Sequence, residues 1–142
     1  GIQFNGDTAA ANALDDYEEG TWTPALSRDG GTFAGTYSTQ SGKYIKIGNQ
    51  VFFTALVSLA TIVTASYQSN TLTGLPFTAG SSQQVGGINV MTSSIFATDV
   101  VAGGNIYNTS IYLRKPANVL AGTNLNENFQ VGGIMLSGVY TV

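Results

Sequence analysis

The sequence predicts an all-β domain, and three observations support that prediction. The 142 residues include 18 glycines, which suit a chain with many tight turns. Between the glycines lie frequent Thr, Val, Ile, Tyr and Phe, the residue types that favour strands. Turn signals recur roughly every eight to twelve residues, as in sandwich folds. We therefore expect an antiparallel β-sandwich, jelly-roll-like in topology, preceded by a short extended or helical stem.

Eight segments are predicted as strands from their β-favouring residues and flanking turn signals. Gly48 and Asn49 tolerate positive φ, so they predict a two-residue hairpin turn. The predicted strands are 21–27, 32–38, 43–48, 50–60, 70–75, 84–91, 105–114 and 129–142.

The segment 50–60, "QVFFTALVSLA", shows the clearest strand pattern. Its odd positions, Val51 to Leu59, form one fully apolar face, because side chains alternate along a strand. The other face is half apolar and includes Phe52 and Leu56. This pattern favours a strand whose inner face lies in the core and whose outer face meets another subunit. The final segment, "FQVGGIMLSGVYTV", is also apolar on both faces, so we expect it to be buried on both sides.

The N-terminal part is the only stretch with helical signals. In "TAAANALDDYEEG", Thr8 is a possible N-cap and Gly20 a possible terminating glycine. We expect at most a short helix, ending before Tyr17. The sequence thus divides into a stem and joint over 1–20 and a head domain over 21–142.

Half of the eight acidic residues lie in the joint, just before the only tryptophan, Trp22. Three interpretations are open for this cluster: a structural joint, a cation site and a catalytic site. Crowded carboxylates repel one another unless they are paired, and the pattern does not match an EF-hand. Trp22 is either a buried anchor or a platform for stacking a sugar. We assign to the joint Asp15, Asp16, Tyr17, Glu18, Glu19 and Trp22.

Composition argues against several functions. The chain has no histidine, which removes Ser-His-Asp triads and most catalytic zinc sites. It has no cysteine, so neither disulfides nor thiolate metal sites are expected. Five basic residues and a net charge of −3 argue against binding nucleic acid or an anionic membrane. We expect no membrane insertion, no cofactor and no metal, and glycoside hydrolysis by two carboxyls is the remaining enzymatic alternative.

Three loops offer side chains suited to binding sugars. Aromatic rings stack on sugar rings, and Asn, Gln and Asp bond hydroxyls, although the same polar residues are also ordinary turn formers. Binding residues concentrate on loops held by rigid scaffolds. The loops are "TASYQSN" at 64–70, "TSSIFATDVVAGGN" at 92–105 and "AGTNLNENFQ" at 121–130. The candidate receptor-binding residues are Tyr67, Gln68, Asn70, Phe96, Asp99, Asn105, Asn124, Asn126 and Glu127.

Four motifs follow one another along the chain: "ANALDDYEEGTWTPAL", "GKYIKIGNQVFF", "LTGLPFTAG" and "LSGVYTV". They resemble elements of tail fibres and tailspikes of tailed bacteriophages. "ANALDDYEEGTWTPAL" resembles the family's "LDDYEEGTWTP" segment, and "GKYIKIGNQVFF" resembles its "Y-x-K-I-G-N-x-V" hairpin. "LTGLPFTAG" resembles its "SGLPF" element, and "LSGVYTV" its closing "SGTYI" strand. The motifs follow the family's order and span most of the chain, whereas 80–130 matches no element of the family.

The resemblance implies the distal receptor-binding domain of a tail fibre in the virion, assembled in the cytoplasm of the bacterial host. It implies a non-catalytic homotrimer that binds a receptor on the host surface, commonly a polysaccharide. The outer-face residues Phe52 and Leu56 are our candidates for the trimer contact. The alternatives are a purely structural domain for trimerisation or folding and, less favoured, a glycan-cleaving tailspike module.

Overall fold

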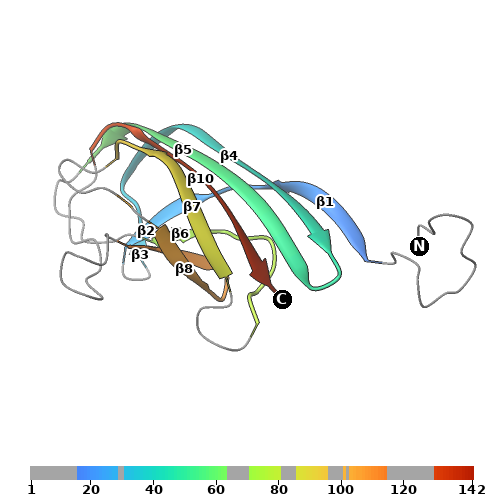
Figure 1. Ribbon diagram of the computed structural model, residues 1–142. Helices are drawn as coiled ribbons and strands as arrows, with labels where there is room; N and C mark the ends of the chain where they lie inside the picture. The colour runs from blue at the N-terminus through green and yellow to red at the C-terminus, as the bar shows by residue number, and fades with distance from the viewer. Residues whose placement is uncertain are drawn as a thin grey trace, which may run out of the picture.

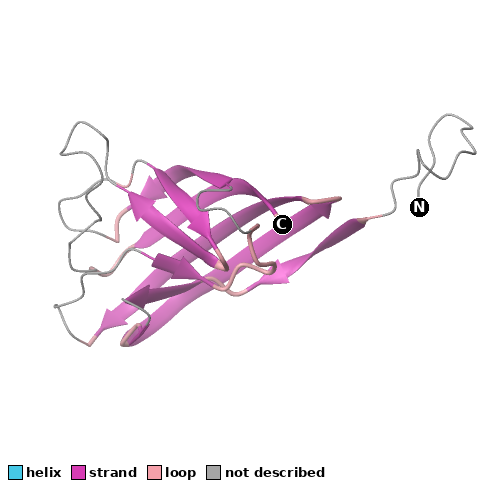
Figure 2. Ribbon diagram, turned by 90° about the horizontal axis from the view of Figure 1, so that it is seen from below, coloured by secondary structure: helices cyan, strands magenta, loops and turns pink. Residues whose placement is uncertain are grey.

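The computed structural model describes residues 16–28, 31–63, 71–80, 86–95, 101, 103–114 and 130–142. The all-β prediction is confirmed, since these residues form strands joined by turns and contain no helix (Figures 1 and 2). The strands are β1 (Tyr17–Trp22), β2 (Ala25–Arg28), β3 (Gly31–Thr32), β4 (Gly35–Ile47), β5 (Gln50–Ile62), β6 (Thr71–Thr73), β7 (Gly86–Ser93), β8 (Gly103–Tyr107), β9 (Ser110–Arg114) and β10 (Gly133–Thr141).

The strands form one continuous antiparallel sheet rather than the two separate sheets expected of a sandwich. Its order is β1-β4-β5-β10-β7-β8-β9-β6-β2-β3. The sheet curls over its own core (Figure 1). The chain passes from the edge strand β1 to β2, the neighbour of the opposite edge strand β3, through only Thr23 and Pro24, so the two ends of the sheet lie close together. Two side chains of β4 fix the segment that joins β1 to β2. The Gln40 amide donates a hydrogen bond to the Pro24 carbonyl (2.9 Å), and the Tyr37 hydroxyl accepts one from the Leu26 N–H (2.9 Å).

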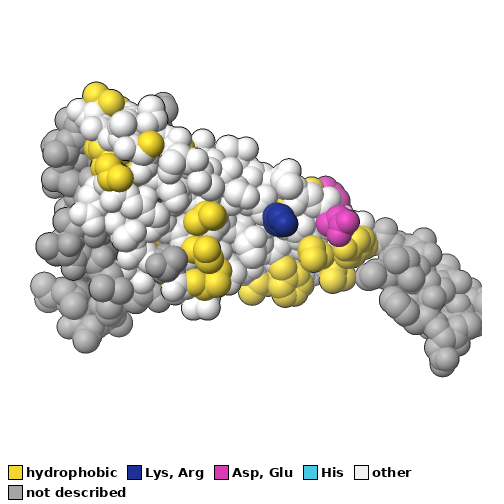
Figure 3. Space-filling view, turned by 90° about the horizontal axis from the view of Figure 1, so that it is seen from above, with side chains coloured by type: hydrophobic (Ala, Val, Ile, Leu, Met, Phe, Trp, Pro, Cys, Tyr) yellow, Lys and Arg dark blue, Asp and Glu magenta, His cyan; other side chains and the backbone are white. Residues whose placement is uncertain are grey.

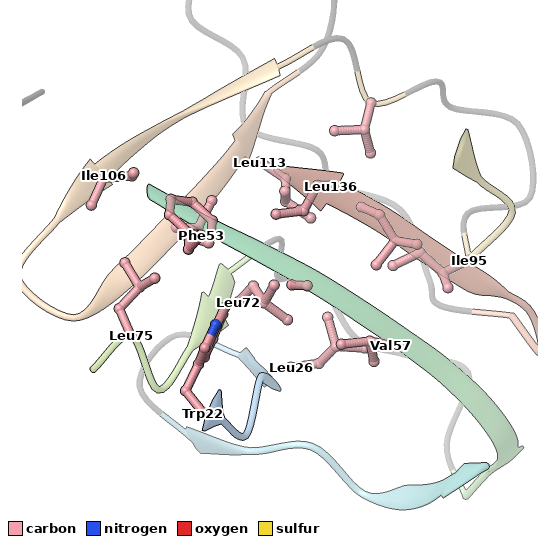
Figure 4. Packing of buried hydrophobic residues seen from close by; sticks show 14 of the residues in the cluster. Trp22, Leu26, Phe53, Val57, Leu72, Leu75, Ile95, Ile106, Leu113 and Leu136 are labelled. Carbon is pink, nitrogen blue, oxygen red and sulfur yellow. The ribbon is translucent and has the colours of Figure 1, made fainter. Parts of the chain in front are cut away.

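The core lies inside the curl, and the inner face of β5 runs through it (Figure 4). All five odd positions of β5 that were predicted to be apolar and inward are at most 3% exposed. Trp22 is 8% exposed and packs edge-on against Phe53, with 6.0 Å between the ring centroids. Its indole N–H donates to the Thr54 carbonyl (3.2 Å). Trp22 is therefore a buried anchor, not an exposed platform for a sugar ring.

Four of the predicted strands needed correction. The segment 21–27 is not one strand, because it spans the end of β1, Thr23, Pro24 and the first residues of β2. The segments 32–38 and 43–48 belong mainly to one strand, β4, which continues through Gly42. A side chain at Gly42 would collide with the Trp22 ring, so this glycine makes room for the anchor and does not end the strand. Segment 105–114 is not a single strand but the hairpin β8–β9, whose turn includes Asn108 at φ 54°. The predicted turn at Gly48 is confirmed, with φ 59°.

The joint differs from its prediction as well. Gly20 does not terminate a helix; it lies within β1, opposite Tyr44 on β4. Its missing side chain leaves room for the Tyr44 ring, since a Cβ there would lie 2.8 Å from the Tyr44 hydroxyl oxygen. Strand β1 begins at Tyr17, so residues 17–20 belong to the sheet and not to a stem. The helix predicted before Tyr17 lies outside the described residues, apart from Asp16.

The outer face of the last strand is also exposed where burial was expected. On β10 the inner side chains of Ile134, Leu136 and Tyr140 are buried in the core. The outer side chains of Met135 and Val139 are 36% and 37% exposed. Within a single chain, β10 is therefore buried on one side only.

Candidate functional site

The strand directions give the domain two distinct ends. Strands β1, β2, β5, β7 and β9 run in one direction, because each neighbouring pair in the sheet is antiparallel. We call the end where β5, β7 and β9 finish the loop end. The opposite end, where β1 begins beside the β4–β5 turn, is the stem end.

The segments with the predicted binding residues leave β5, β7 and β9 at the loop end. They follow Ile62, Ser93 and Arg114, the last residues of those three strands. Most of the predicted binding residues lie outside the described residues: Tyr67, Gln68, Asn70, Phe96, Asp99, Asn124, Asn126 and Glu127. The topology nevertheless attaches all three segments to the same end of one scaffold.

Asn105 is the predicted binding residue that the structure describes. It lies on β8, and its side chain points away from the core because the next residue, Ile106, is fully buried. Its carbonyl oxygen accepts a hydrogen bond from the Arg114 guanidinium (2.9 Å) on the neighbouring strand β9. The site therefore includes a cation that we did not predict. Recognition of the β8–β9 hairpin would have placed Arg114 beside Asn105.

The acidic residues of the joint are divided between the two faces of β1 and engaged by neighbouring side chains. On the inner side, Asp16 forms an ion pair with Lys46. The Tyr44 hydroxyl donates to Glu18 (2.8 Å), and this bond raises the Tyr44 pKa. These contacts support the structural interpretation of the joint; Asp15 lies outside the described residues.

The outer acid of β1 follows the same pattern. Glu19 accepts a hydrogen bond from the Tyr17 hydroxyl (2.7 Å), which raises the Tyr17 pKa. Among the described residues no group of three or more His, Cys, Asp or Glu side chains is placed to hold a metal ion. The described acids are thus distributed along β1 and the residue before it, and they do not converge on a site for a metal ion.

A second candidate site covers the outer side of the sheet. Ile45, Phe52 and Val139 lie side by side across β4, β5 and β10, because the register pairs Ile45 with Phe52 and Phe52 with Val139. Their exposed fractions are 41%, 49% and 37%. An open groove of about 1010 Å³ extends over this region, from Glu19 on β1 to Gly87 on β7. We call this outer surface of β1, β4, β5, β10 and β7 the apolar face.

Figure 3 shows hydrophobic side chains on this side of the molecule, next to acidic and basic ones near the stem end. A row of polar side chains runs beside the apolar row, with Lys43, Thr54 and Ser137 in register on the same three strands. Leu56, our second candidate for a trimer contact, also points outward and is half-buried. The apolar face is suited to binding through apolar contact, supplemented by hydrogen bonds from the polar row.

No family model matches this chain, and no similar protein was found among curated proteins or solved structures. In the part of the chain that the structure describes, no helix is long and apolar enough to span a membrane. The family resemblance therefore depends on the four sequence motifs and on how they lie in the fold.

The four motifs meet in space. The first motif contains β1, which pairs with β4 of the second. Tyr44 of the second motif packs edge-on against Phe77 of the third, with 5.3 Å between ring centroids. The backbone of Phe77 forms two hydrogen bonds with the hydroxyl of Tyr140, which belongs to the fourth motif. Segments that are distant in sequence thus build one structural unit at the stem side of the core.

Proposed function

We propose that this chain is a non-catalytic receptor-binding domain at the distal end of a bacteriophage tail fibre. Its ligand is a polysaccharide on the surface of the host bacterium. The observation that carries the proposal is the separation of the two ends of the sheet. The candidate binding segments leave from the loop end, whereas the N-terminal chain enters at the stem end.

The scaffold and its charge also favour this function. Strands β4 and β5 are 13 residues each, and β5 carries a continuous row of buried apolar side chains, which provides a rigid base for loops at one end. Only 9% of the residues are charged, so the surface suits a neutral, hydroxyl-rich ligand better than a polyanion. The meeting of the four family-like motifs in one structural unit adds support for the fibre assignment.

The direct test is binding of the fluorescently labelled 142-residue chain to susceptible and resistant bacteria. We expect labelling of susceptible cells only, and competition by polysaccharide purified from those cells. Asn105→Ala removes the amide beside Arg114 and should reduce labelling of susceptible cells several-fold. The midpoint of its urea unfolding should equal that of the wild type within error. Equal labelling of both cell types, or of neither, contradicts receptor binding.

One observation favours the alternative, a purely structural domain for trimerisation or folding. The apolar face is exposed in the single chain, and large exposed apolar patches mark interaction surfaces. A structural domain would associate with copies of itself but label no cells. Release of reducing sugar from the host polysaccharide would instead indicate a glycan-cleaving module.

A further inference from the structure

We infer that a second copy of this chain packs against the apolar face, with Phe52 at the centre of the contact. The inference concerns self-association and does not depend on whether the loop end binds a receptor. It identifies which surface of the molecule is buried in the assembly.

The first argument is the concentration of exposed apolar side chains. Monomeric proteins usually scatter such residues singly over the surface. Here six of the eleven exposed large hydrophobic side chains in the described part of the chain lie on one face. They are Tyr17, Ile45, Ile47, Phe52, Met135 and Val139.

The exposed apolar side chains of neighbouring strands lie in register with one another. Tyr17 lies opposite Ile47 on β4, one row nearer the stem end than the row through Ile45, Phe52 and Val139. Adjacent strands are about 4.8 Å apart, so the row through Ile45, Phe52 and Val139 is a continuous apolar strip, and Tyr17 and Ile47 form an apolar pair beside it. A groove of about 1010 Å³ over the central strip provides space for side chains from another protein surface.

The charges on the apolar face suit a second copy of this chain. The two charged side chains that line the groove are Glu19 and Lys43, which have opposite signs and lie on neighbouring strands. The face is therefore close to neutral, and a second copy offers a Lys43 to Glu19 and a Glu19 to Lys43. A sugar lying on the central row would leave hydroxyls facing Ile45 and Val139, which cannot form hydrogen bonds. A second copy fits this surface better than a glycan.

The fourth argument is the position of the chain that precedes β1. Residues 1–15 lead into Tyr17, which is itself part of the apolar face. Chains that enter side by side at the stem end would bring these faces next to one another. The candidate binding segments leave the sheet from its opposite end.

The test is the mass of the 142-residue chain, measured by light scattering during size-exclusion chromatography at micromolar concentration. We expect a mass of two or three chains, three being the number that the family resemblance implies. The double variant Phe52→Ser/Val139→Ser should weaken association at least tenfold and elute as a monomer. Tyr107→Ser on β8 is the matched control, since Tyr107 is 38% exposed and lies off the apolar face; it should leave the mass unchanged.

If the double variant fails to fold, cysteine cross-linking tests the same contact. The chain has no cysteine, so Thr54→Cys places one thiol in the polar row beside Phe52. A bifunctional maleimide should cross-link this variant between chains, whereas Tyr107→Cys should not be cross-linked. A monomeric wild type overturns the inference, and this includes the case in which residues 1–15 cover the face within one chain. Equal cross-linking of both cysteine variants overturns it too.

Self-association and receptor binding can fail separately in these assays. A wild-type oligomer that labels no cells would overturn the proposed function and support the inferred contact. A wild-type monomer that labels only susceptible cells would support the proposed function and overturn the inferred contact.

Discussion

Phe52 and Phe53 are neighbours in the sequence, but their environments are opposite. Phe53 is 3% exposed and packs between the rings of Trp22 and Tyr140, whose centroids are 6.0 and 5.8 Å away. Phe52 is 49% exposed on the other side of the same strand. The comparison shows that the apolar residues of β5 serve two purposes. Those facing inward stabilise the single chain, and those facing outward are available to stabilise an assembly.

The largest expected loss of stability comes from removing the inward-facing ring of Phe53. Phe53→Ala should lower the free energy of unfolding by about 4 kcal/mol, because it removes a buried ring and leaves a cavity beside two other rings. Urea denaturation followed by Trp22 fluorescence measures the change. Phe52→Ala is the matched control, with an expected loss below about 1 kcal/mol for the single chain.

The dependence of the urea midpoint on protein concentration further distinguishes Phe52 from Phe53. If chains associate through the outer face, the wild-type urea midpoint rises with protein concentration. In Phe52→Ala that dependence should disappear, whereas Phe53→Ala should keep it. Equal losses of stability in the two variants, with equal dependence on concentration, would show that the two faces do not differ as described.

The next effect concerns close packing on the inner side. Gly42→Ala should cost about 2 kcal/mol, because a Cβ there would lie 2.4 Å from Nε1 of the Trp22 indole. Gly103→Ala is the control, since a Cβ at Gly103 meets only the Ile88 carbonyl oxygen, at 3.9 Å. Thermal unfolding compares the two variants. A Gly42→Ala protein as stable as Gly103→Ala would mean that the indole moves aside without cost.

Tyr140 gives a smaller effect that depends on pH. Burial raises the Tyr140 pKa to about 12, from an ordinary value near 10. Between about pH 10 and 12 the unfolded chain loses this proton and the folded chain keeps it. Stability should therefore be unaffected by this group below pH 10 and fall by up to about 2 kcal/mol towards pH 12.

Tyr140→Phe tests this assignment in a single variant. It should cost about 1 kcal/mol at pH 8, because the backbone N–H and carbonyl of Phe77 lose their common partner. Its unfolding free energy should then fall less steeply between pH 10 and 12 than that of the wild type. Part of the slope should remain, since the pKa of Tyr37 and of Tyr44 is raised too. An unchanged slope would assign the high-pH loss to other groups.

The parts of the fold that the sequence predicted correctly are those governed by local physics. Alternation along β5 and the Gly48 turn depend on side-chain direction and on positive φ, both of which are readable within a few residues. The unbroken β4 was missed because Gly42 is required by Trp22, 20 positions away. Strand β1 was missed because Asp16 and Glu18 find their partners on β4, a distant segment. The same limit applies to the candidate site, since the Asn105–Arg114 pair depends on a hairpin that was not recognised.

The smallest predicted effect applies the comparison of faces to the acids of β1. Asp16 pairs with Lys46 on the inner side, where the lysine side chain is only 12% exposed and lies 5.8 Å from the Phe77 ring centroid. Asp16 itself is 59% exposed, so solvent screens the pair. Asp16→Asn should cost about 0.5 kcal/mol and less in 1 M salt. Glu19→Gln, on the outer side, should change single-chain stability by less than that. If Glu19→Gln is the more costly variant in dilute protein, the inner acids do not hold β1 to β4, and the joint is stabilised by its apolar contacts alone.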